Sequence, residues 1–140
     1  MSVKIDIHAD DFGESVHASR DILECLKDGK LNSISVLANM SCFEECVRLY
    51  REVQEEFPWQ PMISVHVNLM EGSCLADPKD LSDLVDEKGH FQISWERLFF
   101  VSYFPSGNKF KEQLKIEIEL QIRAVVEALV YSLAITPVRR

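Results

Sequence analysis

The chain has 140 residues, of which 46% are hydrophobic and 27% charged, and it carries a formal net charge of −8 with an isoelectric point near 5.0. This composition predicts a single globular domain over residues 1–140 with its own hydrophobic core. The negative charge argues against nucleic acid or an anionic membrane surface as the main partner, because both are bound through clustered Lys and Arg. No apolar run approaches the roughly 18 to 20 residues of a membrane span, and the N-terminus lacks a signal-peptide pattern, so we expect a cytoplasmic protein.

The four cysteines do not have the spacing of a zinc site. Cys25, Cys42, Cys46 and Cys74 include no C-x-x-C pair. Cys42 and Cys46 lie one helical turn apart, where a buried helix face takes small apolar groups. We therefore expect reduced thiols that pack in the core, and neither disulfides nor a metal site made by this set.

The N-terminal part of the chain predicts alternating strands and helices. Residues 3–9 alternate apolar and polar side chains, which indicates a strand whose polar residues share one face. Residues 14–27 follow helical spacing, and Gly29 after them favours a helix end. The run SISVLANM at 33–40 then predicts a second strand.

A second helix and a third strand follow. The sequence SCFE at 41–44 has the Ser-x-x-Glu form of a capping box, and apolar residues recur at helical spacing from there toward Pro58. The run MISVHVNL at 62–69 predicts a strand with apolar side chains on one face and His66 on the other. Residues 71–108 look like an insertion, and their ISWERLFFVSYF segment is compatible with either a helix or a strand.

The last predicted element is a long helix over residues 109–133. Its apolar residues recur at helical spacing, at Phe110, Leu114, Ile118, Ile122, Val125 and Leu129. The element order as a whole is that of an α/β fold with a parallel sheet. Ligands of such sheets bind at the C-terminal ends of the strands, and there the sequence places Asp10, Asp11, Asn39 and His66.

The adjacent acids Asp10 and Asp11 are the main candidate for chemistry. Consecutive strand residues point to opposite faces, so the two carboxylates can share a site only if the backbone is already leaving the strand. The Phe12-Gly13 pair makes this plausible. With the His66 imidazole the acids form a mixed oxygen and nitrogen ligand set suited to Zn²⁺, Co²⁺ or Mn²⁺, one acid serving as metal ligand and the other as base.

Plainer explanations remain open at this point. Asp10 and Asp11 would also be favourable as N-terminal caps of the next helix. A single histidine such as His66 at a strand end is often a hydrogen-bonded structural residue. His8 shares the polar face with Asp10 and has either a site or a packing role, whereas surface positions are expected for His17 and His90.

Two other classes with acidic motifs fit less well. A receiver domain places paired acids after its first strand but needs a phosphoacceptor Asp ending the third strand, which here ends in His66-Val67-Asn68. Haloacid-dehalogenase-type phosphatases need Asp-x-Asp, which Asp10-Asp11-Phe12 does not provide. The sequence also contains no P-loop, dinucleotide-binding glycine motif or nucleophile elbow.

Three blocks of the sequence together resemble one known family. IHADDFG at 7–13, GKLNSISVLANM at 29–40 and SVHVNLMEG at 64–72 are similar, in order and spacing, to the YdjC/ChbG-like carbohydrate deacetylases. The resemblance implies the N-terminal portion of a (β/α)-barrel-like fold. It also implies a hydrolase that removes N-acetyl groups from amino sugars, such as chitin-derived oligosaccharides, with a divalent metal, Mg²⁺ or Zn²⁺.

The resemblance assigns roles by position. Asp10 resembles the family's catalytic base, Asp11 its metal carboxylate and His66 its first metal histidine. Asn68 is a further candidate donor to the oxyanion that forms when a nucleophile attacks the acetamide carbonyl. A second metal histidine is expected in an Asp-Ser-His-x-His type segment after the long helix, close to where the 140 residues end.

A complete barrel of this kind needs roughly 200 residues or more. We therefore expect the N-terminal half of such a domain or a shortened relative. The expected partners are a small carbohydrate and a second copy of the chain, because half a barrel leaves a sheet edge unpaired. The alternative is a non-catalytic fragment that binds a sugar or a partner.

Overall fold

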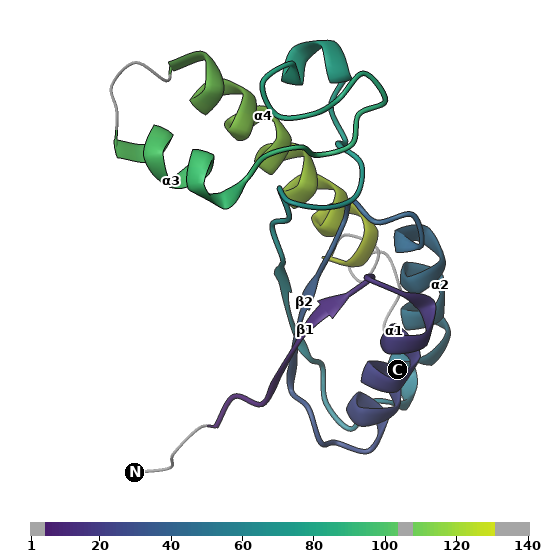
Figure 1. Cartoon of the computed structure of the whole chain (residues 1–140). Helices are drawn as coiled ribbons and strands as arrows, with labels where there is room; N and C mark the ends of the chain where they lie inside the picture. The colour runs from purple at the N-terminus through teal and green to yellow at the C-terminus, as the bar shows by residue number, and fades with distance from the viewer. Residues whose placement is uncertain (1–4, 104–107, 131–140) are drawn as a thin grey trace.

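The structure is a computed structural model that describes residues 5–103 and 108–130 (Figure 1). Figure 1 shows α1 and α2 next to each other beside the strands, whereas α3 and the loop before it group around the N-terminal half of α4. The strands are β1 (His8–Phe12), β2 (Ser33–Val36) and β3 (Met62–Val65), and the α-helices are α1 (Val16–Lys27), α2 (Phe43–Val53), α3 (Trp95–Tyr103) and α4 (Asn108–Val125). Short 3₁₀ turns cover Gln54–Glu56 and Pro78–Leu81, and a π-helical turn covers Val126–Val130.

The strands form one parallel sheet in the order β1-β2-β3. The expected α/β class with parallel strands is therefore confirmed. Both β2 and β3 are shorter than the predicted runs 33–40 and 62–69, because they pair only as far as Val36 and Val65. His66 consequently lies just beyond its strand, at the C-terminal edge of the sheet.

Helices α1 and α2 pack on the sheet around the main hydrophobic core. Phe12, Ile34 and Tyr50 are fully buried there, and the Phe12 and Tyr50 rings meet edge to face. Helix α1 begins at Val16, two residues later than predicted, because the Ser15 side chain caps it by accepting from the Ala18 N–H. The capping role considered for the acid pair is thus filled by another residue.

Helix α2 starts without the predicted capping box at 41–44. Its N-cap residue is Cys42, and no side-chain hydrogen bond caps this helix within the described part of the chain. The Cys42 thiol instead donates to the Gly13 carbonyl, 3.0 Å away, and joins the helix start to the turn after β1. Glu44 and Glu45 occupy the first turn, where their negative charge is favourable.

Residues 66–94 form a loop whose apolar side chains join Phe110 of α4 in a small hydrophobic cluster. Leu81 and Leu84 are its most buried members, and single antiparallel bridges join Ser73 to His90 and Val85 to Phe91. The segment whose state was open from the sequence is helical, as α3. Across the described ranges, no helix combines the length and apolarity that crossing a membrane requires.

Helix α4 differs from the prediction in the face that it buries. Phe110, Val125 and Leu129 are buried as expected, but in between the buried side chains are polar and Ile122 is 42% exposed. The polar residues turned inward are Gln113, Glu117 and Gln121. Their side chains hydrogen bond to loop backbone, which offsets the cost of burying them. Residues 131–133 of the predicted helix lie outside the described residues.

Candidate functional site

The backbone of β1 changes direction at the acid pair. Asp11 has a φ of 64°, the only positive φ among the non-glycine residues that the structure describes, and the pairing register with β2 shifts between Ala9 and Phe12. An irregularity of this kind re-aims side chains at the end of a strand. The expectation that the chain leaves regular strand geometry at Asp10 and Asp11 is confirmed.

Gly13 fixes the turn that follows the acids. Its φ is 101°, and a Cβ at this position would lie 2.8 Å from the carbonyl oxygen of Leu37. Its N–H donates to the buried Ser19 hydroxyl at 2.9 Å. A residue with a side chain would therefore push β1 away from the loop after β2.

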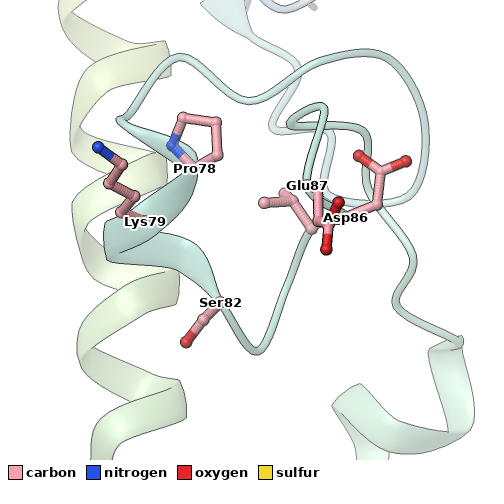
Figure 2. A pocket seen from close by; sticks show the side chains of 6 residues that line it. Pro78, Lys79, Ser82, Asp86 and Glu87 are labelled. Carbon is pink, nitrogen blue, oxygen red and sulfur yellow. The ribbon is translucent and has the colours of Figure 1, made fainter.

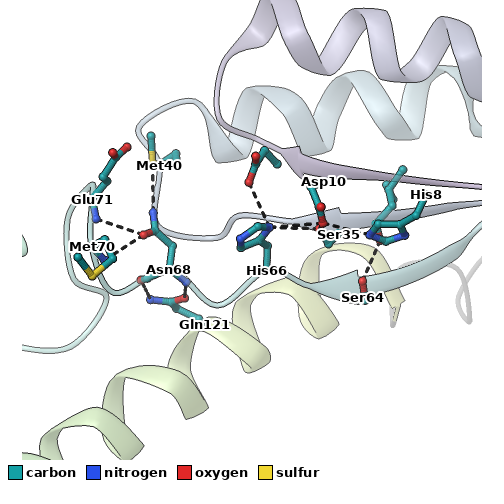
Figure 3. A network of polar contacts seen from close by, with 12 residues as sticks. His8, Asp10, Ser35, Met40, Ser64, His66, Asn68, Met70, Glu71 and Gln121 are labelled. Carbon is teal, nitrogen blue, oxygen red and sulfur yellow. Dashed lines mark hydrogen bonds and ion pairs between the residues drawn. The ribbon is translucent and has the colours of Figure 1, made fainter. Parts of the chain in front are cut away.

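His66 lies against both acids at the edge of the sheet (Figure 3). Its Nδ1 is 3.1 Å from Asp11 Oδ1, 3.8 Å from Asp10 Oδ1 and 3.3 Å from the Ser35 hydroxyl. The prediction that Asp11 and His66 converge at the ends of the first and third strands is confirmed by these distances.

Asp10 is held in a polar row that crosses the sheet. The Ser35 hydroxyl donates to Asp10 Oδ1 at 2.7 Å, and His8 Nε2 lies 3.3 Å from the same oxygen. The Ser35 hydrogen bond lowers the pKa of Asp10 and is the largest effect, burial opposes it less strongly, and the nearby His8 and His66 each add a smaller lowering. Asp10 is therefore ionised at neutral pH. His8 Nδ1 in turn contacts the Ser33 hydroxyl at 2.7 Å.

Asp11 and His66 open onto a pocket of about 290 Å³. The other lining residues are Glu14, Leu37, Met40, Asn68, Met70 and Glu71. Glu14 and Glu71 add two carboxylates that were not predicted as site residues. Glu14 lies in the turn directly after β1 and Glu71 in the loop after β3, so their sequence signal was only their place beside the first quoted block and inside the third.

Comparisons with known proteins show what the chain as a whole is similar to. Residues 4–133 match the family model described as YdjC-like protein. The chain belongs to the YdjC-like family. It is 32% identical over 119 residues to a carbohydrate deacetylase of Thermoanaerobacter pseudethanolicus, covering 84% of this chain and 42% of that protein. It is 38% identical over 96 residues to a carbohydrate deacetylase of Listeria welshimeri, covering 69% of this chain and 36% of that protein.

A solved structure has the same fold over part of its length. It is that of a protein from Enterococcus faecalis V583 assigned to cellobiose-phosphate cleavage, with a TM-score of 0.67 and 25% identity over 88% of this chain and 43% of that one. The YdjC-like chain described here thus spans less than half of the length of the curated relatives and the solved structure that it matches.

The other residues considered from the sequence hold a loop in place or lie on the surface of this YdjC-like chain. Asn39 is buried and donates to the Glu71 carbonyl at 2.9 Å, so it holds the loop and does not line the pocket. Asn68 does line the pocket, but its Oδ1 accepts from the N–H groups of Met70 and Glu71. As expected, His17 and His90 lie on the surface, where each pairs with an acid of its own segment.

The four cysteines are free thiols, as expected. Cys46 is fully buried, and burial raises its pKa to about 11, which keeps the thiol protonated. Cys25, Cys42 and Cys74 are only partly buried. Cys74 donates to the carbonyl of Ala76 within its own loop.

A second pocket of about 330 Å³ lies in the loop before α3 (Figure 2). It is lined by Pro78, Lys79, Ser82, Val85, Asp86 and Glu87. These side chains carry both signs of charge, and none of the residues predicted for the site is among them. Asp11 and His66, by contrast, line the pocket at the sheet edge.

The donor set at the sheet edge fits part of a divalent metal site. A carboxylate oxygen of Asp11 and an imidazole nitrogen of His66 are the ligand types that zinc and related ions accept. Within residues 5–103 and 108–130, however, no group of three or more His, Cys, Asp or Glu side chains is placed to hold an ion. The described residues supply two ligands where metal sites usually draw on three or more.

Proposed function

We propose that this site takes part in metal-dependent removal of N-acetyl groups from amino sugars of the chito-oligosaccharide type. The observation that carries the proposal is the contact of Asp11 with His66 at the sheet edge, beside an ionised Asp10. The names of the relatives as carbohydrate deacetylases support the sugar class of the substrate.

In this proposal Asp11 and His66 hold the divalent ion, Mg²⁺ or Zn²⁺, and Asp10 is the general base. A bound ion would polarise the acetamide carbonyl and acidify a water molecule. Asp10 is available to accept a proton from that water because it is ionised at neutral pH. The Ser35 hydroxyl and His8 orient its carboxylate.

The charge of the pocket supports an amino sugar as the product. Amide hydrolysis releases an amine that takes up a proton and becomes a cation at neutral pH. Glu14 and Glu71 place two further carboxylates around the pocket beside Asp11. Negative walls attract that cation, whereas an anionic ligand would be repelled.

A second candidate is a binding role without catalysis. It is favoured by one observation, that the described residues supply two metal ligands and not three. In that case the pocket would bind a sugar through its polar walls, and acetate would not be released. Metal titration and product analysis separate the two candidates.

Calorimetric titration of the chain with Zn²⁺ and Co²⁺ tests the ligands. We expect weak binding, because two protein ligands hold an ion poorly, and we expect loss of that binding in Asp11→Asn and His66→Ala. His90→Ala is the matched control, since His90 also faces an aspartate, with its Nδ1 3.7 Å from Asp86 Oδ2, but away from the site. Tight stoichiometric binding that survives His66→Ala would show that the ligands are wrong.

Acetate release from a chito-oligosaccharide in the presence of the same ions tests the reaction. We expect little turnover by the 140-residue chain and none after Asp10→Asn. Sugar binding observed without metal, together with no acetate release above that of Asp10→Asn, would contradict the deacetylase proposal and favour the binding role.

A further inference from the structure

The pocket wall is attached to α4 through one buried side chain, Gln121. Its Oε1 accepts from the Asn68 N–H at 2.9 Å, and its Nε2 donates to the Asn68 carbonyl at 2.8 Å (Figure 3). Gln121 is fully buried, so water does not substitute for either bond. A single amide group therefore satisfies both polar groups of one residue in the loop that follows β3.

Glu117, one turn earlier on α4, fixes the orientation of that amide. Its Oε1 accepts the other Nε2 hydrogen of Gln121 at 2.9 Å, and its two oxygens accept from the N–H groups of Leu75 and Ala76 at 3.0 to 3.1 Å. Glu117 is also fully buried. Because its carboxyl group accepts these bonds, the Gln121 nitrogen faces Glu117 and its oxygen faces the Asn68 N–H.

The Asn68 backbone in turn places both the metal-ligand candidate and the pocket wall. Two residues before it, the His66 N–H donates to the Val36 carbonyl of β2 at 2.9 Å, so the segment 66–68 is fixed at both ends. After it, the Asn68 side chain accepts from the N–H groups of Met70 and Glu71, which line the pocket.

We infer that Gln121, oriented by Glu117, is a positioning residue that sets the placement of His66 and of the pocket wall at Asn68. The catalytic meaning of this role rests on the proposed function, but the placement of His66 does not. Gln121 reaches the site only through the Asn68 backbone. Replacing it with an apolar side chain leaves the partly buried Asn68 N–H without its partner and leaves the Asn68 carbonyl with only the Asn39 amide at 3.3 Å, so the segment must move to recover the lost hydrogen bond.

The test compares Gln121→Met with Gln113→Met. Gln113 is the matched control because it lies on the same buried face of α4 and accepts from the Asp83 N–H at 3.0 Å, in a loop that does not line the site. Both variants lose a buried amide of equal size, so they should lose similar stability. Only Gln121→Met should move the site.

The readout is the imidazole NMR spectrum of His66, with Co²⁺ or Zn²⁺ affinity as a second measurement. We expect Gln121→Met to shift the His66 nitrogen resonances. It should also weaken metal binding by about 10-fold, because mutating a group that orients a metal ligand typically lowers metal affinity by at least this factor. Gln113→Met should leave the His66 resonances in place. Glu117→Gln keeps an acceptor for the loop N–H groups. It should therefore shift the His66 resonances in the same direction as Gln121→Met, but by a smaller amount.

Unchanged His66 resonances in folded Gln121→Met, or equal shifts in Gln121→Met and Gln113→Met, would overturn the inference. If the unmodified chain binds no metal, the proposed function fails. The His66 spectrum then still shows whether Gln121 positions His66. If Gln121→Met does not fold, the His66 resonances of Glu117→Gln can be compared with those of Gln113→Met instead, and only Glu117→Gln should shift them.

Discussion

Asp11 places a carboxylate on a backbone conformation that most side chains avoid. A left-handed φ of 64° costs an L-residue free energy, although Asp and Asn tolerate it better than most. The conformation is held by the pairing of β1 with β2 and by the Gly13 turn. Strain of this kind is typical of functional sites, where the side chain is needed at that position.

Stability and metal binding should therefore respond in opposite directions at Asp11. We expect Asp11→Gly to raise the free energy of unfolding by about 0.5 to 1 kcal/mol, because glycine adopts this φ without steric cost. Metal binding should be lost in the same variant. Urea unfolding and calorimetry measure the two effects, and Asp11→Asn should be near neutral in stability. A less stable Asp11→Gly protein would show that the backbone is not strained.

Ser35 sets the protonation of the expected base. Its hydroxyl donates to Asp10 and stabilises the ionised form, so Ser35→Ala should raise the pKa of Asp10 toward its ordinary value of 3.8. Carboxyl-carbon NMR titration measures this pKa. Ser64→Ala is the control, because the Ser64 hydroxyl donates to the Ile34 carbonyl and not to a carboxylate. An unchanged pKa in Ser35→Ala would leave the histidines as the dominant cause.

Part of the site was predictable from single residues and part was not. Asp10, Asp11 and His66 could be identified because the periodicity places the two acids near the end of the first strand and His66 near the end of the third, and because all three stand in family-like blocks. Glu71 stands in a block as well, but its role and that of Gln121 could not be predicted, since they depend on how a loop and a distant helix return to the sheet edge. Hydrophobic periodicity carries no information on such contacts.

At the scale of elements, the hydrophobic pattern of the sequence was least reliable for α4, because it predicted the wrong buried face. An apolar stripe at helical spacing predicts a buried face, yet Ile122 is 42% exposed and Gln121 beside it is fully buried. The buried amides and carboxyl group are stable because loop N–H groups point at them, and those loops lie far away in sequence. The number of strands and their places along the chain were predicted, whereas their ends depended on where pairing partners stop.

Two nearby substitutions on α4 test which of its faces is buried. We expect Ile122→Gln to change the free energy of unfolding by no more than about 0.5 kcal/mol, as for ordinary surface positions. Val125→Ala should cost about 2 kcal/mol, because Val125 is 1% exposed and its loss leaves a cavity in the main core. Chemical denaturation of both variants gives the comparison. A larger loss in Ile122→Gln than in Val125→Ala would mean that the helix packs through its apolar stripe.

At the scale of the whole molecule, the described sheet has two edges. Its order β1-β2-β3 leaves β1 and β3 each paired on one side within the described residues. Segment 91–103 does not add a strand, because it leads into and forms α3. Exposed apolar side chains lie next to both edges, including Ile7 at 51% and Met62 at 61% exposure. Edges of this kind favour pairing with another chain.

We therefore expect the chain to self-associate. Size-exclusion chromatography with light scattering should give masses above 16.1 kDa that rise with concentration. Met62→Lys should reduce association, because a charged side chain on an edge strand opposes pairing. Ile122→Lys is the comparison for the outer face of α4. A monomer at all concentrations would contradict the expectation, and a loss of association only in Ile122→Lys would place the contact on α4.

The polar face of α4 also determines which changes of length the fold can accept. Gln113, Glu117 and Gln121 are spaced four residues apart and contact the loops at 82–83, 75–76 and 68, in reverse order along the chain. At 1.5 Å per residue the outer two contacts lie about 12 Å apart along the helix axis. An apolar face can slide along its neighbour, but three directional contacts permit one axial position. Insertions in the loops between residues 68 and 83 can bulge outward. One residue added inside α4 before Gln121, in contrast, would rotate the contacts that follow it by about 100° relative to those before it and separate the site from its support.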